Sequence, residues 1–474
     1  MSNDQTNAVT RLACSFAIDL SFDKVPADVR DQMKLHILDA IGSGIAGAGT
    51  SLGEQLVALT ALEHAPGPVP ILGIGRTLGP AAAAFANAGA MNALDCDDGF
   101  EIAGRGMGHP GASIVAAAVS GAFGPRTISG SRFLTVVTAS YEINNRLIFS
   151  MQPTIERFRF VYGVCQHQSF ASAVAYGLLD GASADELENI VGLAGTLANV
   201  PSLRKYNFED RPIVSLKDFN APAAESGVRA VQMHRVGLSG AKAVLDGPAG
   251  LWRMLGSDQF EPAVIAQGLG DTWLARRSSL KAYPACRWIH TCLEAFQTTY
   301  EKHGLTPDEI EKIRVFTSRG IVTDFMDVAP RTMVDAQFSL PYALAALAYR
   351  LTPFSSWFTS EAMRSPRNLA FATKVEAVVD PQIDSLMRNE RRPVGRVEIA
   401  ARGTTFASPQ FDYALGSPER PLSDQMVRSK FLANVVPVVG NATAAELCER
   451  LMSIENEEDV RRLIALASGS GDHR

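Results

Sequence analysis

Residues 79–94 read GPAAAAFANAGAMNAL, a run of small apolar residues with proline at its second position. Proline suits the first position of a helix, because its missing N–H is one that the start of a helix leaves unbonded anyway. The alanines then continue the helix with almost no polar side chain on any face, which is typical of a buried helix. We therefore expect a core helix that ends near Leu94.

Helical patterns also prevail elsewhere in the first half of the chain. Apolar residues recur at helical spacing between Met33 and Ile41, and runs that alternate like strands are few. Ser183 and Glu186 match a capping box ahead of another apolar stripe, which reaches Leu197. The first half is thus predicted to be helical.

The pattern changes after about residue 271, where strand-like stretches appear among helical ones. Residues 312–317, 375–379 and 394–400 alternate in the manner of strands, and residues 337–349 have helical spacing. The segment TPDE at 306–309 predicts the start of a short helix. Together these signals indicate a separate α+β domain.

Helical signals return near the C-terminus. The amphipathic stretch 455–468 predicts a helix that packs back on the N-terminal helices. A chain of 474 residues also exceeds what one hydrophobic core usually supports. We therefore predict a mainly α fold, in which residues 1–270 and 406–474 form a large all-helical domain and residues 271–405 form a smaller inserted α+β domain.

The net charge and the cysteines argue against several classes of protein. A net charge of −6 offers no attraction to nucleic acid or to an anionic membrane surface. The six cysteines are scattered without a C-x-x-C pair, which fits neither a disulfide framework nor structural zinc. The N-terminus lacks the pattern of a secretory signal, and the longest apolar runs are shorter than the roughly 20 residues of a membrane span. We expect a cytoplasmic protein with no nucleic-acid or membrane partner.

The segment that follows the buried helix carries the first candidate chemistry. Four acids stand between that helix and a glycine-rich stretch, and they are Asp95, Asp97, Asp98 and Glu101. His109 follows directly, ahead of a second apolar helix, where free amides and the helix dipole favour a bound carboxylate. The segment therefore indicates either a site that binds an acid and transfers a proton, or a set of helix caps with a hydrogen-bonded loop histidine.

Two metal sites are alternative interpretations of the same acids. An EF-hand loop needs oxygen ligands at alternate positions, and the spacing fails after Asp97. Residues 97–101 spell DDxxE, as in magnesium sites of prenyl-type enzymes. A helix that carried those ligands should not contain Gly99 and three further glycines just beyond it, and we find no second acidic motif. We expect no metal.

The segment KAYPACRWIH at 281–290 concentrates cations, a tyrosine and a histidine. Arg287 is suited to hold a carboxylate with two N–H groups, and His290 or Tyr283 to donate a proton. The alternative is a helix start in which the tryptophan and isoleucine are core and Lys281 is solvated.

Lys217 lies among small residues, where an ammonium that faced a ligand would be only partly hydrated, although most lysines are simply exposed. The glycines at 73, 75 and 79 depart from the dinucleotide fingerprint, so no nucleotide cofactor is expected.

The chain resembles the MmgE/PrpD family in several separated segments that run nearly from end to end. The matching text is LDAIG at 38–42, residues 86–98, HPG at 109–111, Lys217 with the following AAESGVRA, KxYPxCR at 281–287 with His290, and DAQFSLPY at 335–342. The resemblance implies a helical domain built from both chain ends, an inserted α+β lid domain, a homodimer, and an active site between the domains.

The family includes 2-methylcitrate dehydratase, cis-aconitate decarboxylase and iminodisuccinate epimerase, which act on small di- or tricarboxylates without metal or organic cofactor. Their common step is proton transfer at a carbon next to a carboxylate or its imine. The resemblance implies pocket residues at four positions, with Tyr283 and Arg287 as neighbours in the matching motif. The four positions are Asp95, His109, Lys217 and His290.

The chain departs from the family pattern in two places. Asn92 stands where members usually have a histidine. The family's His-x-Thr element has no clear counterpart, and His167 or Tyr162 is the candidate to replace it. Substrate-binding candidates are thus Lys281, Arg287, Asn92, Tyr162 and His167.

We predict a cofactor-free lyase or isomerase that acts on a small carboxylate. His109 would be the general base, oriented by Asp95, while Lys217 and Arg287 would stabilise negative charge that develops on the substrate. His290 or Tyr283 would protonate the leaving hydroxyl or the opposite face of the substrate.

The sequence favours a hydro-lyase like 2-methylcitrate dehydratase, with an epimerase or a decarboxylase as alternatives. A family member that only binds a metabolite, and the prenyl-type magnesium enzyme, are the alternatives from other classes.

Overall fold

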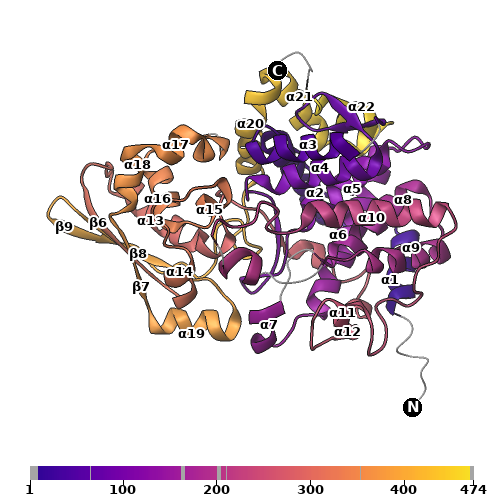
Figure 1. Cartoon of the computed structure of the whole chain (residues 1–474), viewed down its shortest axis with the longest axis horizontal. Helices are drawn as coiled ribbons and strands as arrows, with labels where there is room; N and C mark the ends of the chain where they lie inside the picture. Colours follow the sequence, from indigo (N-terminus) through magenta and orange to yellow (C-terminus); the bar gives the residue numbers. More distant parts are fainter. Residues whose placement is uncertain are drawn as a thin grey trace.

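The structure, a computed structural model, describes residues 9–63, 66–161, 166–199, 204–209, 211–352 and 354–469. Helices make up most of it, and the one sheet of four strands lies in the smaller part, on the left of Figure 1. The prediction of a mainly α fold with a smaller α+β part is therefore confirmed.

Helices from both ends of the chain build the larger hydrophobic core, which also includes Trp273 and Leu280. The C-terminal helices lie against the N-terminal ones, on the right of Figure 1, and α20 packs on α2. The helices of this part are α1 (Val9–Asp19), α2 (Ala27–Ala48), α3 (Ser51–Glu63), α4 (Pro80–Ala93), α5 (Pro110–Ala122), α6 (Gly130–Ser150), α7 (Ile155–Val161), α8 (Gln168–Asp180), α9 (Ala184–Thr196), α10 (Asn220–Arg235), α11 (Leu251–Met254), α12 (Pro262–Ala266), α20 (Asp424–Val439), α21 (Asn441–Met452) and α22 (Val460–Leu466).

The alanine-rich helix α4 lies at the centre of this core, as the sequence predicts. It begins at Pro80 with Gly79 as its N-cap and packs against α2, α5 and α10. Small side chains allow this close packing: a Cβ atom at Gly47 would lie 1.9 Å from the carbonyl oxygen of Ala90. The end of α4 is thereby held by packing on several sides.

A second core surrounds the four-stranded sheet, whose order is β7-β6-β8-β9. Strand β6 pairs in parallel with β7 and antiparallel with β8, which pairs antiparallel with β9. The strands and helices of this part are α13 (His290–Lys302), β6 (Ile310–Thr317), α14 (Arg319–Asp324), α15 (Met333–Gln337), α16 (Leu340–Ala348), α17 (Ser360–Arg364), α18 (Pro366–Ala372), β7 (Val375–Val379), α19 (Pro381–Glu390), β8 (Arg396–Ala401) and β9 (Thr404–Ala407).

Two short sheets lie outside the second core. One pairs β1 with β2, and the other has the order β4-β3-β5. Their strands are β1 (Val69–Ile71), β2 (Arg76–Leu78), β3 (Gly99–Ile102), β4 (Arg105–Gly106) and β5 (Ser278–Ser279). The pairing of Gly99 with Ser279 matters most, because it joins the acidic segment to the start of 281–290.

Several predictions for single segments are confirmed, and one is wrong. The capping box of Ser183 and Glu186 is confirmed, and β6 and β7 cover the strands predicted at 312–317 and 375–379. The short helix predicted at 306–309 is wrong, because the Glu309 carboxylate accepts the Thr306 N–H within a turn and β6 begins directly afterwards.

The domain limits at 270/271 and 405/406 stay a prediction. Within the part of the chain that the structure describes, no helix is both long and apolar enough to cross a membrane.

Candidate active site

The acidic segment leaves α4 through a sharp reversal of the backbone. Asp95 has a φ of 52°, in the left-handed region of backbone conformation. Residues other than glycine seldom adopt this region, although aspartate does so more often than most. The chain then forms the β3–β4 hairpin and reaches His109, which is the N-cap of α5. A strained position at an acid within a buried segment is typical of a functional site.

A cluster of buried charges surrounds Asp95. Its Oδ1 atom accepts hydrogen bonds from Lys217 Nζ at 2.8 Å and from Lys281 Nζ at 2.7 Å. All three residues are 2 % exposed, so water does not solvate these charges. Burial opposes the charged form of Asp95, but the two ammonium groups outweigh it and hold the pKa of the carboxyl below its ordinary value.

Lys217 joins two carboxylates, because its ammonium also donates to Asp218 Oδ2. Burial disfavours that ammonium, yet Asp218 and Asp95 raise the pKa of Lys217 well above its ordinary value. The same interaction outweighs burial at Asp218 and lowers the pKa of that carboxyl. The three groups therefore remain charged, and Lys217 is not a proton donor near neutral pH.

Asn92, the residue that departs from the family pattern, lies behind this cluster. Its Nδ2 donates to Asp218 Oδ2 and to Asp97 Oδ2, both at 3.1 Å. Asp97 is fully buried, and burial raises its pKa despite the nearby His109 and Lys281. Asn92 therefore holds two carboxylates in position and does not line the pocket described below.

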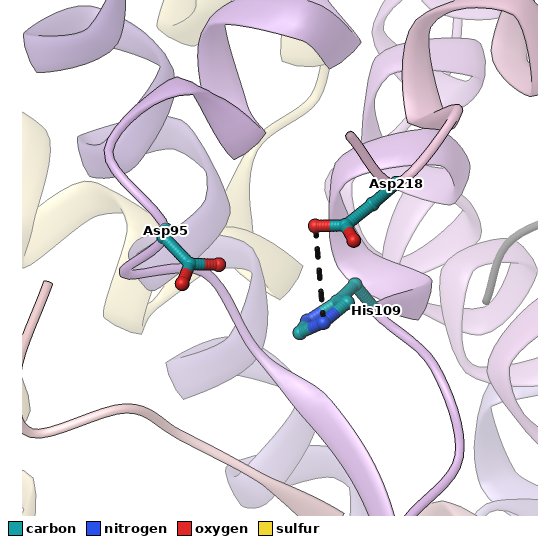
Figure 2. A group of neighbouring side chains, drawn as sticks. All are labelled: Asp95, His109 and Asp218. Carbon is teal, nitrogen blue, oxygen red and sulfur yellow. Dashed lines mark ion pairs between the residues drawn. The ribbon is translucent and has the colours of Figure 1, made fainter. Parts of the chain in front are cut away.

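The ring of His109 is fixed by the main chain and faces the cluster with one nitrogen. Nδ1 lies 2.7 Å from the carbonyl oxygen of Asp98, which can only accept, so Nδ1 carries the hydrogen. In the neutral ring Nε2 then carries no hydrogen, and it lies 4.0 Å from Asp218 Oδ2. Figure 2 shows the Asp218 carboxylate above this ring, with a dashed line between them, and the Asp95 carboxylate to the left.

The prediction that Asp95 orients His109 is therefore corrected. Asp95 is paired with two lysines, and the group that sets the tautomer of His109 is the carbonyl of Asp98. The Asp98 side chain anchors that carbonyl by accepting hydrogen bonds from Tyr141 Oη at 2.9 Å and from the Gly111 N–H at 2.8 Å. The sequence predicts that free amides at the start of α5 bind a substrate carboxylate. The Gly111 amide, however, already donates to Asp98.

A pocket of about 70 Å³ opens in front of His109. Its polar wall contains the cluster residues Asp95, His109, Asp218 and Lys281, together with Glu101 and Arg287. Its apolar wall is aromatic and consists of Phe100, Phe158, Phe208, Trp288 and Phe338. The pocket thus combines a few convergent charges with apolar side chains, as small-molecule sites commonly do.

Arg287 belongs to this pocket wall and has one side-chain nitrogen without a partner among the described residues. Its Nε donates to Glu101 Oε1 at 2.7 Å and its Nη1 to the carbonyl of Leu415 at 3.1 Å. Its Nη2 is buried and has no hydrogen-bond partner among the described residues. A buried donor without a partner is costly, and a substrate carboxylate would satisfy it.

Two predicted proton donors, Tyr283 and His290, do not line this pocket. The hydroxyl of Tyr283 donates to Gln297 Oε1 at 2.7 Å and lines a separate hollow. His290 is fully buried, its Nε2 bonds the carbonyl of Ala285 at 2.9 Å, and burial together with Arg287 lowers its pKa far below the ordinary value. A short 3-10 turn at Arg287–Ile289 separates these two residues along the chain.

His167 lies elsewhere as well. It lines a smaller hollow with Gln152 and Gln166, away from the residues that surround His109. Burial lowers the pKa of His167 to about 3, and its Nε2 has no hydrogen-bond partner in the described part of the chain. Tyr162, the other candidate for the missing family element, lies outside the described residues.

The buried His167 is expected to make the protein sensitive to acid. An unfolded histidine binds a proton below about pH 6.5, whereas the folded one stays neutral down to about pH 3, so stability is complete above pH 6.5 and falls as the pH falls through this window. At pH 5 the loss is about 2 kcal/mol. The free energy of unfolding in urea is measured at pH 7 and at pH 5. His167→Gln should remove the loss of stability between these two pH values. Equal losses in the variant and the original protein would contradict the assignment.

The acids of the DDxxE motif do not converge on one point. They lie before and on the β3–β4 hairpin and not on a helix, and each has a different partner: Asn92 for Asp97, Tyr141 for Asp98 and Arg287 for Glu101. The prenyl-type magnesium site is therefore not supported by the geometry.

A different trio satisfies the spacing of a metal site. Ligand atoms of Asp95, His109 and Asp218 lie within 4.8 Å of one another. The ammonium of Lys217, however, bonds both carboxylates of this trio. A metal ion would have to displace that ammonium, so the donor set is already satisfied by the protein's own cation.

Asp218 is the site residue that sequence reasoning missed. It directly follows Lys217, and Phe219, with a φ of 58°, reverses the chain into α10. Its position next to Lys217, a predicted site residue, is a signal that the sequence contains. Only the fold shows that the side chains of Lys217 and Asp218 contact each other. The aromatic residues of the pocket wall come from separate segments, and no local pattern marks them.

Both family models match the chain in the order expected. Residues 11–263 match the MmgE/PrpD N-terminal domain, and residues 283–453 match the MmgE/PrpD C-terminal domain. The chain belongs to the MmgE/PrpD family.

Among curated proteins, the chain is similar to cis-aconitate decarboxylases. It is 23% identical to the enzyme of Aspergillus terreus over 489 residues, which cover 97% of this chain and 96% of the relative. It is 24% identical to the enzyme of Mus musculus, with coverage of 92% and 88%, and 23% identical to that of Homo sapiens, with coverage of 93% and 90%.

Proposed function

We propose that the protein is a lyase that acts on a small di- or tricarboxylate and transfers one proton through His109 Nε2. The observation that carries the proposal is the geometry of His109: its Nδ1 is held by the Asp98 carbonyl, and its Nε2 is left beside a buried carboxylate at the pocket wall. A histidine whose tautomer is fixed in this way is suited to exchange a proton at a defined position.

The pocket supports a substrate that carries several carboxylates. Arg287 offers its unpartnered Nη2, and Lys281 adds a buried ammonium nearby. The aromatic wall keeps water from these charges, which strengthens their attraction for an anion. Such preorganised cations stabilise an enolate-like anion better than water does.

Decarboxylation fits the arrangement best. In a cis-aconitate-like substrate, the bond between a carbon and its carboxylate breaks and carbon dioxide leaves. The remaining electron pair spreads through the double bond onto a second carboxylate. Protonated His109 then gives its Nε2 proton to the carbon next to that second carboxylate, at the far end of the allylic system. Solvent restores the proton to His109. This sequence needs one proton donor, and the relatives named above are decarboxylases.

The hydro-lyase favoured by the sequence needs a second acid for the leaving hydroxyl, and an epimerase needs acids on both faces. Tyr283 and His290, the candidates for that role, do not line the pocket. Independence from metal, the homodimer and the cytoplasmic location stay predictions.

The proposal is tested by incubating protein dialysed against EDTA with a panel of acids that includes cis-aconitate, 2-methylcitrate and iminodisuccinate. Products are identified by NMR, and carbon dioxide is measured in parallel. Release of carbon dioxide from an unsaturated tricarboxylate supports the proposal. A dehydration product would assign a hydro-lyase and contradict the decarboxylation step. A stereoisomer of the added acid as the only product would assign an epimerase, and no reaction would assign a binding protein; either outcome would overturn the proposal.

Substitution of Arg287 by glutamine is expected to raise KM about 10- to 100-fold with a smaller change in kcat, because a charge-assisted hydrogen bond to substrate is lost. Glutamine can still donate to Glu101, so the wall should remain folded. Arg314→Gln, on the distant sheet, is the matched control. Unchanged KM with a reduced kcat would contradict the assigned binding role.

A further inference from the structure

Another hollow lies between helices α7, α14 and α19, where the two parts of the molecule meet in the lower half of Figure 1. Its volume of about 490 Å³ is several times that of the pocket before His109. Four arginines and two acids line it, and they are Arg204, Arg319, Arg388, Arg391, Asp324 and Asp384. We call it the arginine cleft.

The charges of the arginine cleft favour an anionic ligand. Arg388 pairs with Asp384 at 3.2 Å, but its side chain remains 60% exposed. Arg319 is exposed and has no ion-pair partner among the described residues. Arginines therefore outnumber acids in a cleft of a protein whose net charge is −6. An excess of one sign on a concave surface attracts ligands of the opposite sign and speeds their association.

One side chain connects the arginine cleft to the inner pocket. Phe158, on α7, lines both hollows. The guanidinium of Arg391 lies 4.2 Å from the centre of its ring, and Arg391 is itself held by a hydrogen bond to Gln152. The ring thus forms part of the wall between the two hollows, and an arginine of the cleft holds it in place.

We propose that the arginine cleft captures the polycarboxylate substrate and passes it to the inner pocket past Phe158. This inference rests on the proposed function, because it takes the substrate to be a small anion with two or three carboxylates. Guanidinium groups bind such anions through paired N–H groups, and several arginines around one cleft suit a ligand with several carboxylates.

The test measures association and turnover separately. The probe is propane-1,2,3-tricarboxylate, a saturated acid that cannot decarboxylate in the proposed manner, and its binding is followed by stopped-flow fluorescence because Trp288 lines the inner pocket. The double variant Arg319→Gln/Arg388→Gln removes two charges from the arginine cleft. Arg76→Gln, an exposed arginine on β2, is the control.

At an ionic strength of about 20 mM, the double variant is expected to reduce the association rate constant about 5- to 10-fold, and the difference should vanish near 0.5 M salt. Its kcat on the true substrate should be unchanged while kcat/KM falls. Equal association rates in the double variant and the original protein, an equal effect of Arg76→Gln, or no binding of the probe would overturn the proposal. Altered association without turnover of any acid would leave capture in place and refute the lyase instead.

Discussion

Replacement of His109 by asparagine is expected to lower kcat by about 10²- to 10⁴-fold, the usual contribution of a positioned acid–base group. The asparagine amide can still donate to the carbonyl of Asp98, as Nδ1 does, so the hairpin should keep its shape. What is lost is Nε2, the nitrogen that faces Asp218. The measurement is kcat under saturating substrate, with folding checked by circular dichroism.

His303→Asn is the matched control, because His303 lies beside Phe406 in the α+β part. It should keep full activity. A fall of less than about threefold in the His109→Asn variant would show that another group transfers the proton.

Lys217→Met is expected to destabilise the protein by about 3–5 kcal/mol, because removal of one partner of a buried ion pair leaves charge without compensation. Asp95 would keep Lys281, but Asp218 would lose the ammonium that it contacts. The measurement is the free energy of unfolding in urea at pH 7.

The double variant Lys217→Met/Asp218→Asn should recover part of this loss, since the carboxylate left without its ammonium is removed as well. Lys217 lowers the pKa of Asp218 in the folded state, so its stabilising effect is fully present above the unfolded pKa of about 3.9 and is lost as the pH falls below that value toward the pKa of the folded state. The difference in unfolding free energy between Lys217→Met and the original protein should therefore become smaller in acid. A difference in unfolding free energy that grows in acid would contradict these roles of Lys217 and Asp218. A double variant less stable than Lys217→Met would contradict them as well.

The fold could be predicted in those places where local preference and tertiary packing agree. In α4, small apolar residues both favour a helix and fit between its neighbours, so the sequence signal is sufficient. The alternation at 375–379 likewise matches β7. At 306–309 the same side-chain contact serves a helix start or a turn equally well, and the strand that follows decides between them.

The site could be predicted only in part, for a related reason. Asp95 and His109 belong to one continuous segment, and the glycine-rich hairpin between them brings them together. Tyr283 and His290 lie close to Arg287 in sequence, but the irregular backbone there turns them away from the pocket. Asp218 comes from a distant segment, so only the packing of α10 against α4 and α5 reveals it.

Proton transfer through His109 can be followed with deuterium. The protein is incubated with cis-aconitate in D₂O, and the product is examined by NMR for deuterium and for loss of one carboxylate. We expect a decarboxylated product that carries one deuterium at the newly protonated carbon, formed by the original protein and not by His109→Asn. Deuterated product formed by His109→Asn at the original rate, or no decarboxylated product from the original protein, would contradict this expectation.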